Sequence, residues 1–196
     1  MHFKIIIMRG YLKIIMALGI IFLSESCLTI GTAVDGNIVL SSEKELDKIV
    51  IDGPENAVKY IDRFKSIAVS EMKRTGVPAS IKLAQGILES GYGSSELAKK
   101  ANNHFGMKCG SQWNGKTYQL KGSCYRAYAN ADICYKEHSE FLKRKHYESL
   151  FKLKKTDYKG WAKGLQKAGY ATDKNYPAKL IELIERYKLY RFDQLG

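Results

Sequence analysis

The stretch PASIKLAQGILESGYGSSELA, Pro78 to Ala98, combines a helical pattern with an unusually placed carboxylate. Its proline suits the first turn of a helix, and apolar residues then recur every three or four positions. Glu89 follows this apolar face and comes just before Gly91 and Gly93, which are expected to end the helix. A glutamate on a helix surface would be ordinary, so this position raises the question of whether Glu89 does chemistry.

Glu89 belongs to the last turn of this helix, on the same face as Gln85 one turn earlier. Apolar neighbours and the negative end of the helix dipole both disfavour the ionised carboxylate, so we expect a raised pKa. A carboxyl group that keeps its proton near neutral pH can act as a general acid. The two glycines would then leave room for a ligand. The alternative interpretation is a surface glutamate beside glycines that only stop the helix.

Charge and the N-terminal residues indicate where the protein acts. The chain has 196 residues and a formal net charge of +12, which usually means an anionic partner. Three basic residues precede and flank an apolar run from Ile14 to Leu23, which is short for a membrane span and typical of a signal peptide. We therefore predict export to the periplasm or cell envelope. Export disfavours a nucleic-acid partner and favours an anionic polymer of the envelope.

Two kinds of N-terminal processing remain open. Cleavage after Ser26 or Ala33 would release a soluble protein, whereas Cys27 could instead carry a lipid anchor. A polar linker that contains Gly36, Gly53 and Pro54 follows. The predicted division is a signal segment or lipoprotein signal at residues 1–33, a linker at 34–54 and one folded domain at 55–196.

The remaining cysteines predict one disulfide. Export makes disulfide bonds permissible. Cys109 and Cys124 flank a stretch rich in Gly, Tyr and Trp that we interpret as a hairpin, with the Asn-Gly pair at 114–115 as its turn, so we pair them. Cys134 lies in a helical pattern and is expected to be a buried free thiol. We predict no metal site, because the histidines are scattered and no metal-binding motif is present.

Helical patterns account for most of the remaining domain, which is therefore assigned to the mainly α class, with α+β character from the hairpin. Ser94 or Ser95 is the expected N-cap of a short helix, and Thr156 that of a later one. Pro177 suits the first turn of the last helix. The predicted helices cover residues 55–74, 78–90, 95–101, 130–145, 157–169 and 176–190, with the hairpin lobe between 104 and 128.

Three blocks of the sequence resemble one known family. ILESGYGSSELAKKANNHFGMKC resembles the catalytic helix and following loop of bacterial glucosaminidase domains, glycoside hydrolase family 73. CYRAYANADICYKEHSEFL and LQKAGYATDKNYPAKLIELI are similar to later blocks of the same family, in the same order. The resemblance runs from Ala57 to about Phe192. It implies a lysozyme-like helical domain with a small hairpin lobe, acting as a monomer on peptidoglycan without a cofactor.

The resemblance also implies roles for individual residues. Glu89 corresponds to the general acid, which would protonate the leaving oxygen of a β-1,4 bond after N-acetylglucosamine. Tyr170 corresponds to an aromatic residue that lines the cleft and helps to place substrate or water. Asp173 is also expected to cap the loop before the last helix. The residues expected to bind substrate are Gln85, Tyr92, Phe105 and Asp173.

The chain departs from the family pattern in one respect. Glycosidases usually place a second acid across the scissile bond, and in this family a Glu or Asp on the hairpin is often proposed for that role. Here no Asp or Glu lies between Glu96 and Asp132. Either Asp173 or Asp132 supplies the second carboxylate, or the acetamido group of the substrate replaces it. A lytic transglycosylase and a non-catalytic peptidoglycan-binding module remain alternatives.

Overall fold

The computed structural model describes residues 44–196. The predicted signal segment, Cys27 and the first part of the predicted linker lie outside these residues. None of the helices in the described part is both long enough and apolar enough to cross a membrane. Residues 44–47 are helical, and Leu46 and Ile51 are buried in the core of the domain, so the second half of the predicted linker packs against it.

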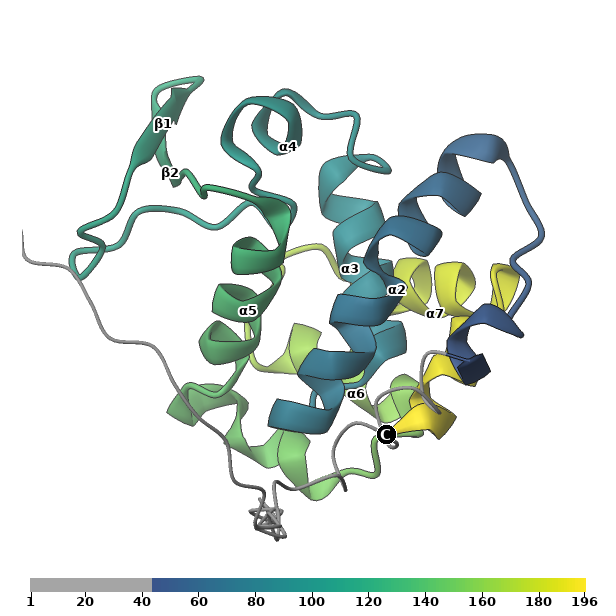
Figure 1. The fold of residues 1–196 in the computed structure, drawn as a ribbon. Coiled ribbons are helices and arrows are strands. Elements are labelled where there is room, and N and C mark those ends of the chain that lie inside the picture. The colour runs from purple at the N-terminus through teal and green to yellow at the C-terminus, as the bar shows by residue number, and fades with distance from the viewer. Residues whose placement is uncertain (1–43) are drawn as a thin grey trace, which may run out of the picture. The chain divides into compact units, whose positions relative to one another are not determined.

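The described chain is mainly helical with one antiparallel hairpin, as the sequence predicted. Figure 1 shows the hairpin standing at one side of the helices, next to α4 and beyond the start of α5. Two short 3-10 helices, η1 and η2, complete the fold. The elements are α2 (Glu55–Thr75), α3 (Ala79–Ser90), α4 (Glu96–Ala101), β1 (Thr117–Leu120), β2 (Ser123–Arg126), α5 (Ala131–Leu142), η1 (Lys145–Lys152), α6 (Tyr158–Lys167), α7 (Tyr176–Arg186) and η2 (Leu189–Leu195).

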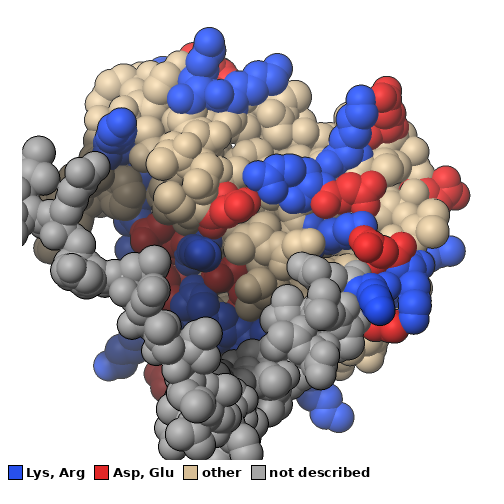
Figure 2. Space-filling model, viewed as in Figure 1, with Lys and Arg blue, Asp and Glu red and all other residues tan. Residues whose placement is uncertain are grey.

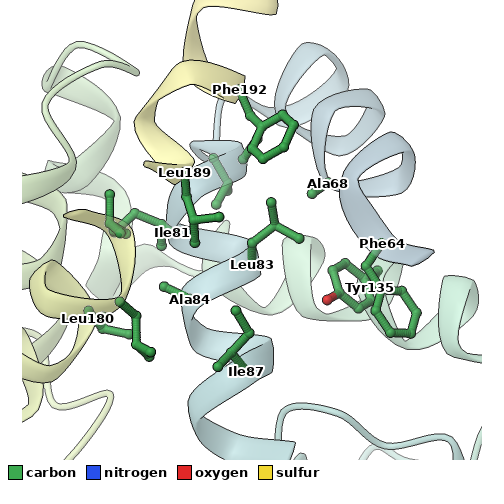
Figure 3. Close-up of a cluster of buried hydrophobic side chains, with 14 of the residues drawn as sticks. Phe64, Ala68, Ile81, Leu83, Ala84, Ile87, Tyr135, Leu180, Leu189 and Phe192 are labelled. Atoms are coloured by element: carbon green, nitrogen blue, oxygen red, sulfur yellow. The ribbon is translucent and has the colours of Figure 1, made fainter. Parts of the chain in front are cut away.

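Helix α3 forms the centre of the core. It packs against α2, α6, α7 and η2, and Figure 3 shows its side chains pointing toward several of these neighbours. Ile81 lies on the opposite face of the helix from Leu83 and Ile87, yet all three are almost fully buried. Burial of each such side chain stabilises the fold by about 1.5–3 kcal/mol. The helix is therefore buried nearly all round, whereas its sequence periodicity predicted one apolar face.

Both ends of α3 are held by side chains. At the start, the carboxylate of Asp193 in η2 accepts hydrogen bonds from the Ser80 backbone N–H (2.8 Å) and hydroxyl (2.6 Å). At the end, Gly91 adopts a left-handed conformation (φ 56°), and its N–H bonds to the carbonyl of Ile87. The hydroxyl of Ser90 accepts a hydrogen bond from the backbone N–H of Gly93 at 2.7 Å. These contacts fix where the helix stops, directly after Glu89.

The hairpin contains the predicted disulfide but turns at a different place. Cys109 and Cys124 are bonded, and Cys134 is a buried free thiol, so both predictions are confirmed. The turn is formed by Lys121 and Gly122, which have positive φ (48° and 74°), and not by Asn114-Gly115. The Asn-Gly pair instead belongs to the loop before β1. Either dipeptide suits a tight turn locally, and the pairing of the two strands decides between them.

Most helix starts follow the expected capping chemistry. Ser95 caps α4, and its hydroxyl accepts from the Ala98 N–H. Helix α6 is capped by Asp157 and not by Thr156, because the Asp157 carboxylate accepts from the Gly160 N–H at 2.9 Å. Pro177 lies in the first turn of α7 as predicted. The segments at 145–152 and 189–195 were expected to extend neighbouring α-helices or were left unassigned, and both form 3-10 helices.

Candidate active site

A cleft of about 1140 Å³ opens between the hairpin and the helices. One wall contains the end of α3, the start of α4 and the loop before α7. The other contains the hairpin and the loop that leads to it, and α5 contributes side chains between them. Glu89, Phe105, Tyr170 and Asp173 all line this cleft, so four of the predicted site residues come together.

Glu89 lies at the end of α3 with its side chain open to the cleft. The protein around the carboxyl group removes it partly from water, which raises its pKa, while the nearby Tyr176 hydroxyl acts in the opposite direction. The raised pKa agrees with the expectation from the sequence. Among the described residues Lys179 pairs with Asp173 and Arg126 with Glu137, so neither cation neutralises Glu89. A glutamate in this environment is suited to donating a proton.

Tyr176 connects Glu89 to the core. It begins α7, is almost completely buried, and lines the cleft. The buried Gln85 side chain donates from Nε2 to the Tyr176 hydroxyl at 3.0 Å. Gln85 was predicted to bind substrate, but it does not line the cleft and instead holds Tyr176. The sequence pattern marked Tyr176 only as the residue before Pro177, and nothing local pointed to the site.

Tyr170 reaches the cleft from the loop after α6. Its hydroxyl lies 3.0 Å from Nε2 of His138 on α5. The His138 ring stacks on Phe105, with ring centroids 3.8 Å apart and an interplanar angle of 5°. Tyr170, His138 and Phe105 therefore form one connected group at the cleft, in which His138 and Phe105 are almost completely buried. In the sequence His138 is one of several scattered histidines, and nothing local indicates this position in the cleft.

Two further carboxylates line the cleft, Glu96 and Asp173. The Glu96 carboxylate accepts from the Tyr118 hydroxyl of β1 at 2.7 Å. Asp173 accepts from Lys179 Nζ and from the Asn175 backbone N–H, both at 2.8 Å, as expected for a residue that caps its loop. The Lys179 ammonium and this N–H lower the pKa of Asp173.

Asp132 is not part of the cleft surface and instead lies 3.5 Å from Arg63. It had been considered as a second acid. Tyr92 also lies off the cleft, where its hydroxyl bonds to that of Tyr187 at 3.0 Å. Gly91 and Gly93 do not line the cleft either, so they act as a helix stop and do not leave room for a ligand beside Glu89. Gly93 approaches the rings of Tyr60 and His104.

The rim of the cleft is rich in basic residues. Lys108 and Lys121 belong to the hairpin lobe, and Arg144 follows α5. All three are exposed, and none of them forms an ion pair with a carboxylate of residues 44–196. Figure 2 shows that basic side chains are also common over the visible face of the molecule. The cleft thus presents positive charge around an opening that contains three carboxylates.

No three His, Cys, Asp or Glu side chains of the described chain are grouped so that they could hold a metal ion.

Comparison with known proteins identifies the family. Residues 65–189 match the Glucosaminidase family model, described as mannosyl-glycoprotein endo-beta-N-acetylglucosaminidase. This chain belongs to the glucosaminidase family. It is 33% identical over 173 residues to the exo-glucosaminidase LytG of Bacillus subtilis, covering 80% of this chain and 60% of LytG. It is 26% identical over 151 residues to the peptidoglycan hydrolase FlgJ of Vibrio parahaemolyticus, covering 69% of this chain and 48% of FlgJ. The glucosaminidase chain thus spans about half to three-fifths of these relatives.

Solved structures share the fold of this glucosaminidase. The catalytic domain of the autolysin Auto from Listeria monocytogenes superposes with a TM-score of 0.64 at 24% identity, covering 79% of this chain and 97% of that one. A peptidoglycan hydrolase from Sphingomonas sp. A1 superposes with a TM-score of 0.60 at 28% identity, covering 68% of this chain and 91% of that one. These matches confirm the predicted lysozyme-like helical domain with its hairpin lobe.

Proposed function

We propose that this glucosaminidase hydrolyses the β-1,4 bond after N-acetylglucosamine within peptidoglycan strands, with Glu89 as the general acid. The observation that carries the proposal is the position of Glu89 in the cleft, unpaired and with a raised pKa. Glu89 would protonate the glycosidic oxygen as the bond to the sugar breaks, which is the step a general acid accelerates. We expect the protein to do this outside the cytoplasm, as a monomer and without a cofactor.

The second group of the reaction is proposed to belong to the substrate. Asp173 is engaged by Lys179 and a backbone N–H, and Glu96 by Tyr118, whereas the hairpin itself carries no carboxylate. The acetamido group of N-acetylglucosamine can attack the anomeric carbon in place of an enzyme carboxylate, a known exception to the two-acid rule. Tyr170 would then steady the reacting centre from the cleft wall.

The basic rim supports a substrate that still carries its stem peptides. Strands stripped by an amidase keep one lactyl carboxylate on each N-acetylmuramic acid, whereas stem peptides carry carboxylates that extend further from the glycan. Lys108, Lys121 and Arg144 lie around the opening without carboxylate partners among the described residues, and would attract such groups. Peptide-bearing strands should therefore be cleaved with a lower KM than strands from which an amidase has removed the peptides.

Digestion of purified peptidoglycan, with mass spectrometry of the products, tests the proposal. The wild type should release fragments with reducing N-acetylglucosamine ends, and long fragments should appear first if cleavage is internal. Glu89→Gln should lower kcat by about 10²- to 10⁴-fold, because the amide cannot donate the proton. Its melting temperature should stay unchanged, because the side chain is open to the cleft and forms no ion pair.

Matched variants and an inhibitor separate the mechanisms. Glu96→Gln and Asp173→Asn should each retain most of kcat, and a thiazoline that mimics the cyclised acetamido group should bind tightly. Anhydro-muramyl ends would identify a lytic transglycosylase, and release of single sugars from strand ends would identify an exo enzyme. A Glu89→Gln variant with near wild-type turnover would contradict the assignment of the acid.

A further inference from the structure

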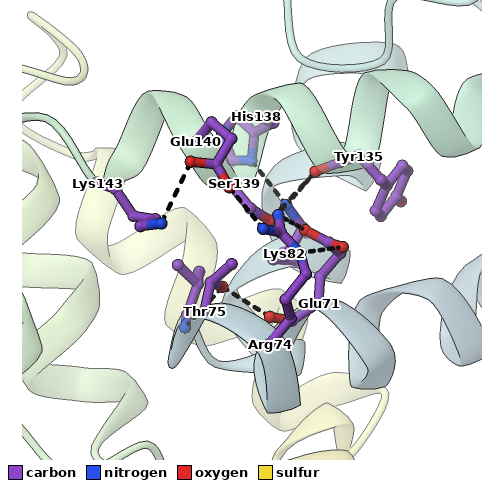
Figure 4. A network of polar contacts seen from close by, with 10 residues as sticks. Glu71, Arg74, Thr75, Lys82, Tyr135, His138, Ser139, Glu140 and Lys143 are labelled. Atoms are coloured by element: carbon purple, nitrogen blue, oxygen red, sulfur yellow. Dashed lines mark hydrogen bonds and ion pairs between the residues drawn. The ribbon is translucent and has the colours of Figure 1, made fainter.

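A lysine is buried directly behind the cleft. Lys82 of α3 is fully inaccessible, and its ammonium group reaches the α5 backbone and side chains (Figure 4). Nζ lies 2.7 Å from the Tyr135 carbonyl oxygen, 2.7 Å from the Ser139 hydroxyl and 3.2 Å from Nδ1 of His138. On its other side the carboxylate of Glu71 contributes opposite charge. A buried charge is costly, so a group that is kept there is a candidate for a specific role.

The hydrogen atoms of Lys82 can be assigned from these three contacts. A carbonyl oxygen only accepts, so the Tyr135 contact uses one N–H of Lys82. The Ser139 hydroxyl directs its own hydrogen to the same carbonyl (3.2 Å), so it accepts a second N–H from Lys82. The third hydrogen of the ammonium group then points at Nδ1 of His138. Lys82 can therefore donate to His138 only while it is an ammonium ion.

This contact decides which nitrogen of His138 carries a proton. Burial, together with the Lys82 cation, holds the pKa of His138 well below its ordinary value, so the ring is neutral and has one N–H. When Nδ1 accepts from Lys82, the proton must be on Nε2. Nε2–H then donates to the Tyr170 oxygen at 3.0 Å.

The hydroxyl hydrogen of Tyr170 is consequently free for a different acceptor. The Tyr170 and Tyr176 rings lie 5.6 Å apart in the cleft, and the two hydroxyl groups are close enough to affect each other's ionisation. Glu89 also acts on the ionisation of both. Tyr170 can then turn its hydrogen toward the cleft, where Tyr176 and Glu89 are neighbouring acceptors.

We propose that Lys82 and His138 are positioning residues for the cleft: Lys82 fixes the tautomer of His138, and His138 makes the Tyr170 hydroxyl a donor toward the Tyr176–Glu89 side. The kinetic part of this inference rests on the proposed glycosidase function. Without the Lys82 proton, His138 could take the opposite tautomer, and Tyr170 would donate back to Nε2 and be withdrawn from the cleft. The chain Lys82–His138–Tyr170 thus transmits the direction of one hydrogen bond from the core to the site.

The surroundings of Lys82 act on its proton in opposite directions. Glu71 and Arg74 face it from α2, and Cys134 and His138 from α5. Burial lowers the pKa of Lys82 to about 7, while the Glu71 carboxylate acts in the opposite direction. Glu71 is itself held by Arg74 through both carboxylate oxygens, at 2.6 and 2.9 Å. Below that pH Lys82 is an ammonium ion, and the assignment above holds.

Nitrogen-15 NMR of the imidazole tests the first step without any substrate. Below the pKa of Lys82, His138 should show a protonated Nε2 and an unprotonated Nδ1 in the wild type. Lys82→Met should abolish this preference, because methionine has no hydrogen to donate. The exposed Lys136 on the same helix as His138 offers the matched control, Lys136→Met, which should leave the tautomer unchanged. A wild-type His138 protonated on Nδ1, or a tautomer unaffected by Lys82→Met, would overturn the proposal.

A double-mutant cycle on peptidoglycan cleavage tests the second step. Lys82→Met and Tyr170→Phe should each lower kcat by about tenfold, with little change in KM. A tenfold loss of rate corresponds to about one hydrogen bond lost in the transition state. The double variant should be no slower than Tyr170→Phe alone, since Lys82 acts only through that hydroxyl. Folding is checked by thermal melting, and Glu71 keeps Arg74 as its partner in the variant. If the losses of kcat in the two single variants multiply in the double variant, Lys82 has a structural role and the proposal is wrong. If the wild type fails to cleave peptidoglycan, the proposed function is refuted, and the NMR measurement alone decides the role of Lys82.

Discussion

The hairpin wall of the cleft should depend on its disulfide far more than the helices do. Cys109 and Cys124 are separated by 15 residues, and bridging a loop of this length contributes about 3 kcal/mol in the chain-entropy model. A two-stranded hairpin without further support is marginally stable. Apart from the disulfide, its tertiary support includes the Tyr118–Glu96 hydrogen bond and the stacking of Arg126 on Trp113.

Removing the bridge should therefore open the hairpin locally. In a Cys109→Ser/Cys124→Ser variant, amide hydrogens of β1 and β2 should exchange about 100-fold faster, because about 3 kcal/mol corresponds to roughly two decades in an opening equilibrium. Amides of α3 should exchange at the wild-type rate, since its core contacts do not involve the hairpin. Hydrogen exchange followed by mass spectrometry resolves the two regions.

The effect of removing the disulfide on catalysis should also be confined to the hairpin side of the cleft. Lys121 and Arg126 line the cleft from the hairpin, whereas Glu89, Tyr170 and Tyr176 come from the helical side. KM should rise while kcat changes little. Cys134→Ala is the control, because it removes a thiol and keeps the bridge. Unchanged exchange in β1 and β2, or acceleration that extends equally into α3, would refute the view that the disulfide stabilises the hairpin as a separate unit.

Two further expectations concern the ends of α3. Asp193→Ala should lower the free energy of unfolding by about 1–3 kcal/mol in urea titrations, because it leaves both Ser80 donors unpaired. Asp193→Asn keeps an acceptor and should lower it less. Equal losses in the two variants would contradict the capping role. The pH–kcat profile should have an alkaline limb above the ordinary pKa of glutamate, since a general acid with a raised pKa keeps its proton to higher pH. Tyr176→Phe should move that limb further upward, because its hydroxyl favours the ionised Glu89, and a downward shift would show that the sign is wrong.

The predictable part of the fold was set by local chemistry. The helices at α2, α3 and α7, the Ser95 cap and the Cys109–Cys124 pair all follow from residues near one another in the sequence. The predictions that were wrong depended on segments that are distant in the sequence. Asn114-Gly115 is a good turn sequence, but strand register gives the turn to Lys121-Gly122. The burial of α3 on all sides likewise depends on η2, which lies about a hundred residues later.

The site divides in the same way. Glu89 could be found because its helix, its apolar neighbours and its glycine stop are contiguous. Tyr176 could not, since its contact with Gln85 joins residues 91 positions apart. The contact of Lys82 with His138 spans 56 positions, and a lysine in a helical pattern is read as solvent-exposed. Contacts that cross the core in this way have no local signature in the sequence.

The second carboxylate illustrates a limit of family resemblance. The family resemblance pointed to an acid on the hairpin, and the stretch without Asp or Glu begins directly after Glu96. Glu96 nevertheless lines the cleft, and Tyr118 of β1 donates to it, so a carboxylate from α4 does meet the hairpin. A nucleophile or base must direct a free oxygen lone pair at the sugar or its water, about 5–10 Å from the general acid. The Tyr118 bond instead joins Glu96 to the opposite wall, which suits a residue that holds the two walls of the cleft together. Under the proposed function the acetamido group of the substrate would then act together with Glu89, and no acid on the hairpin would be needed.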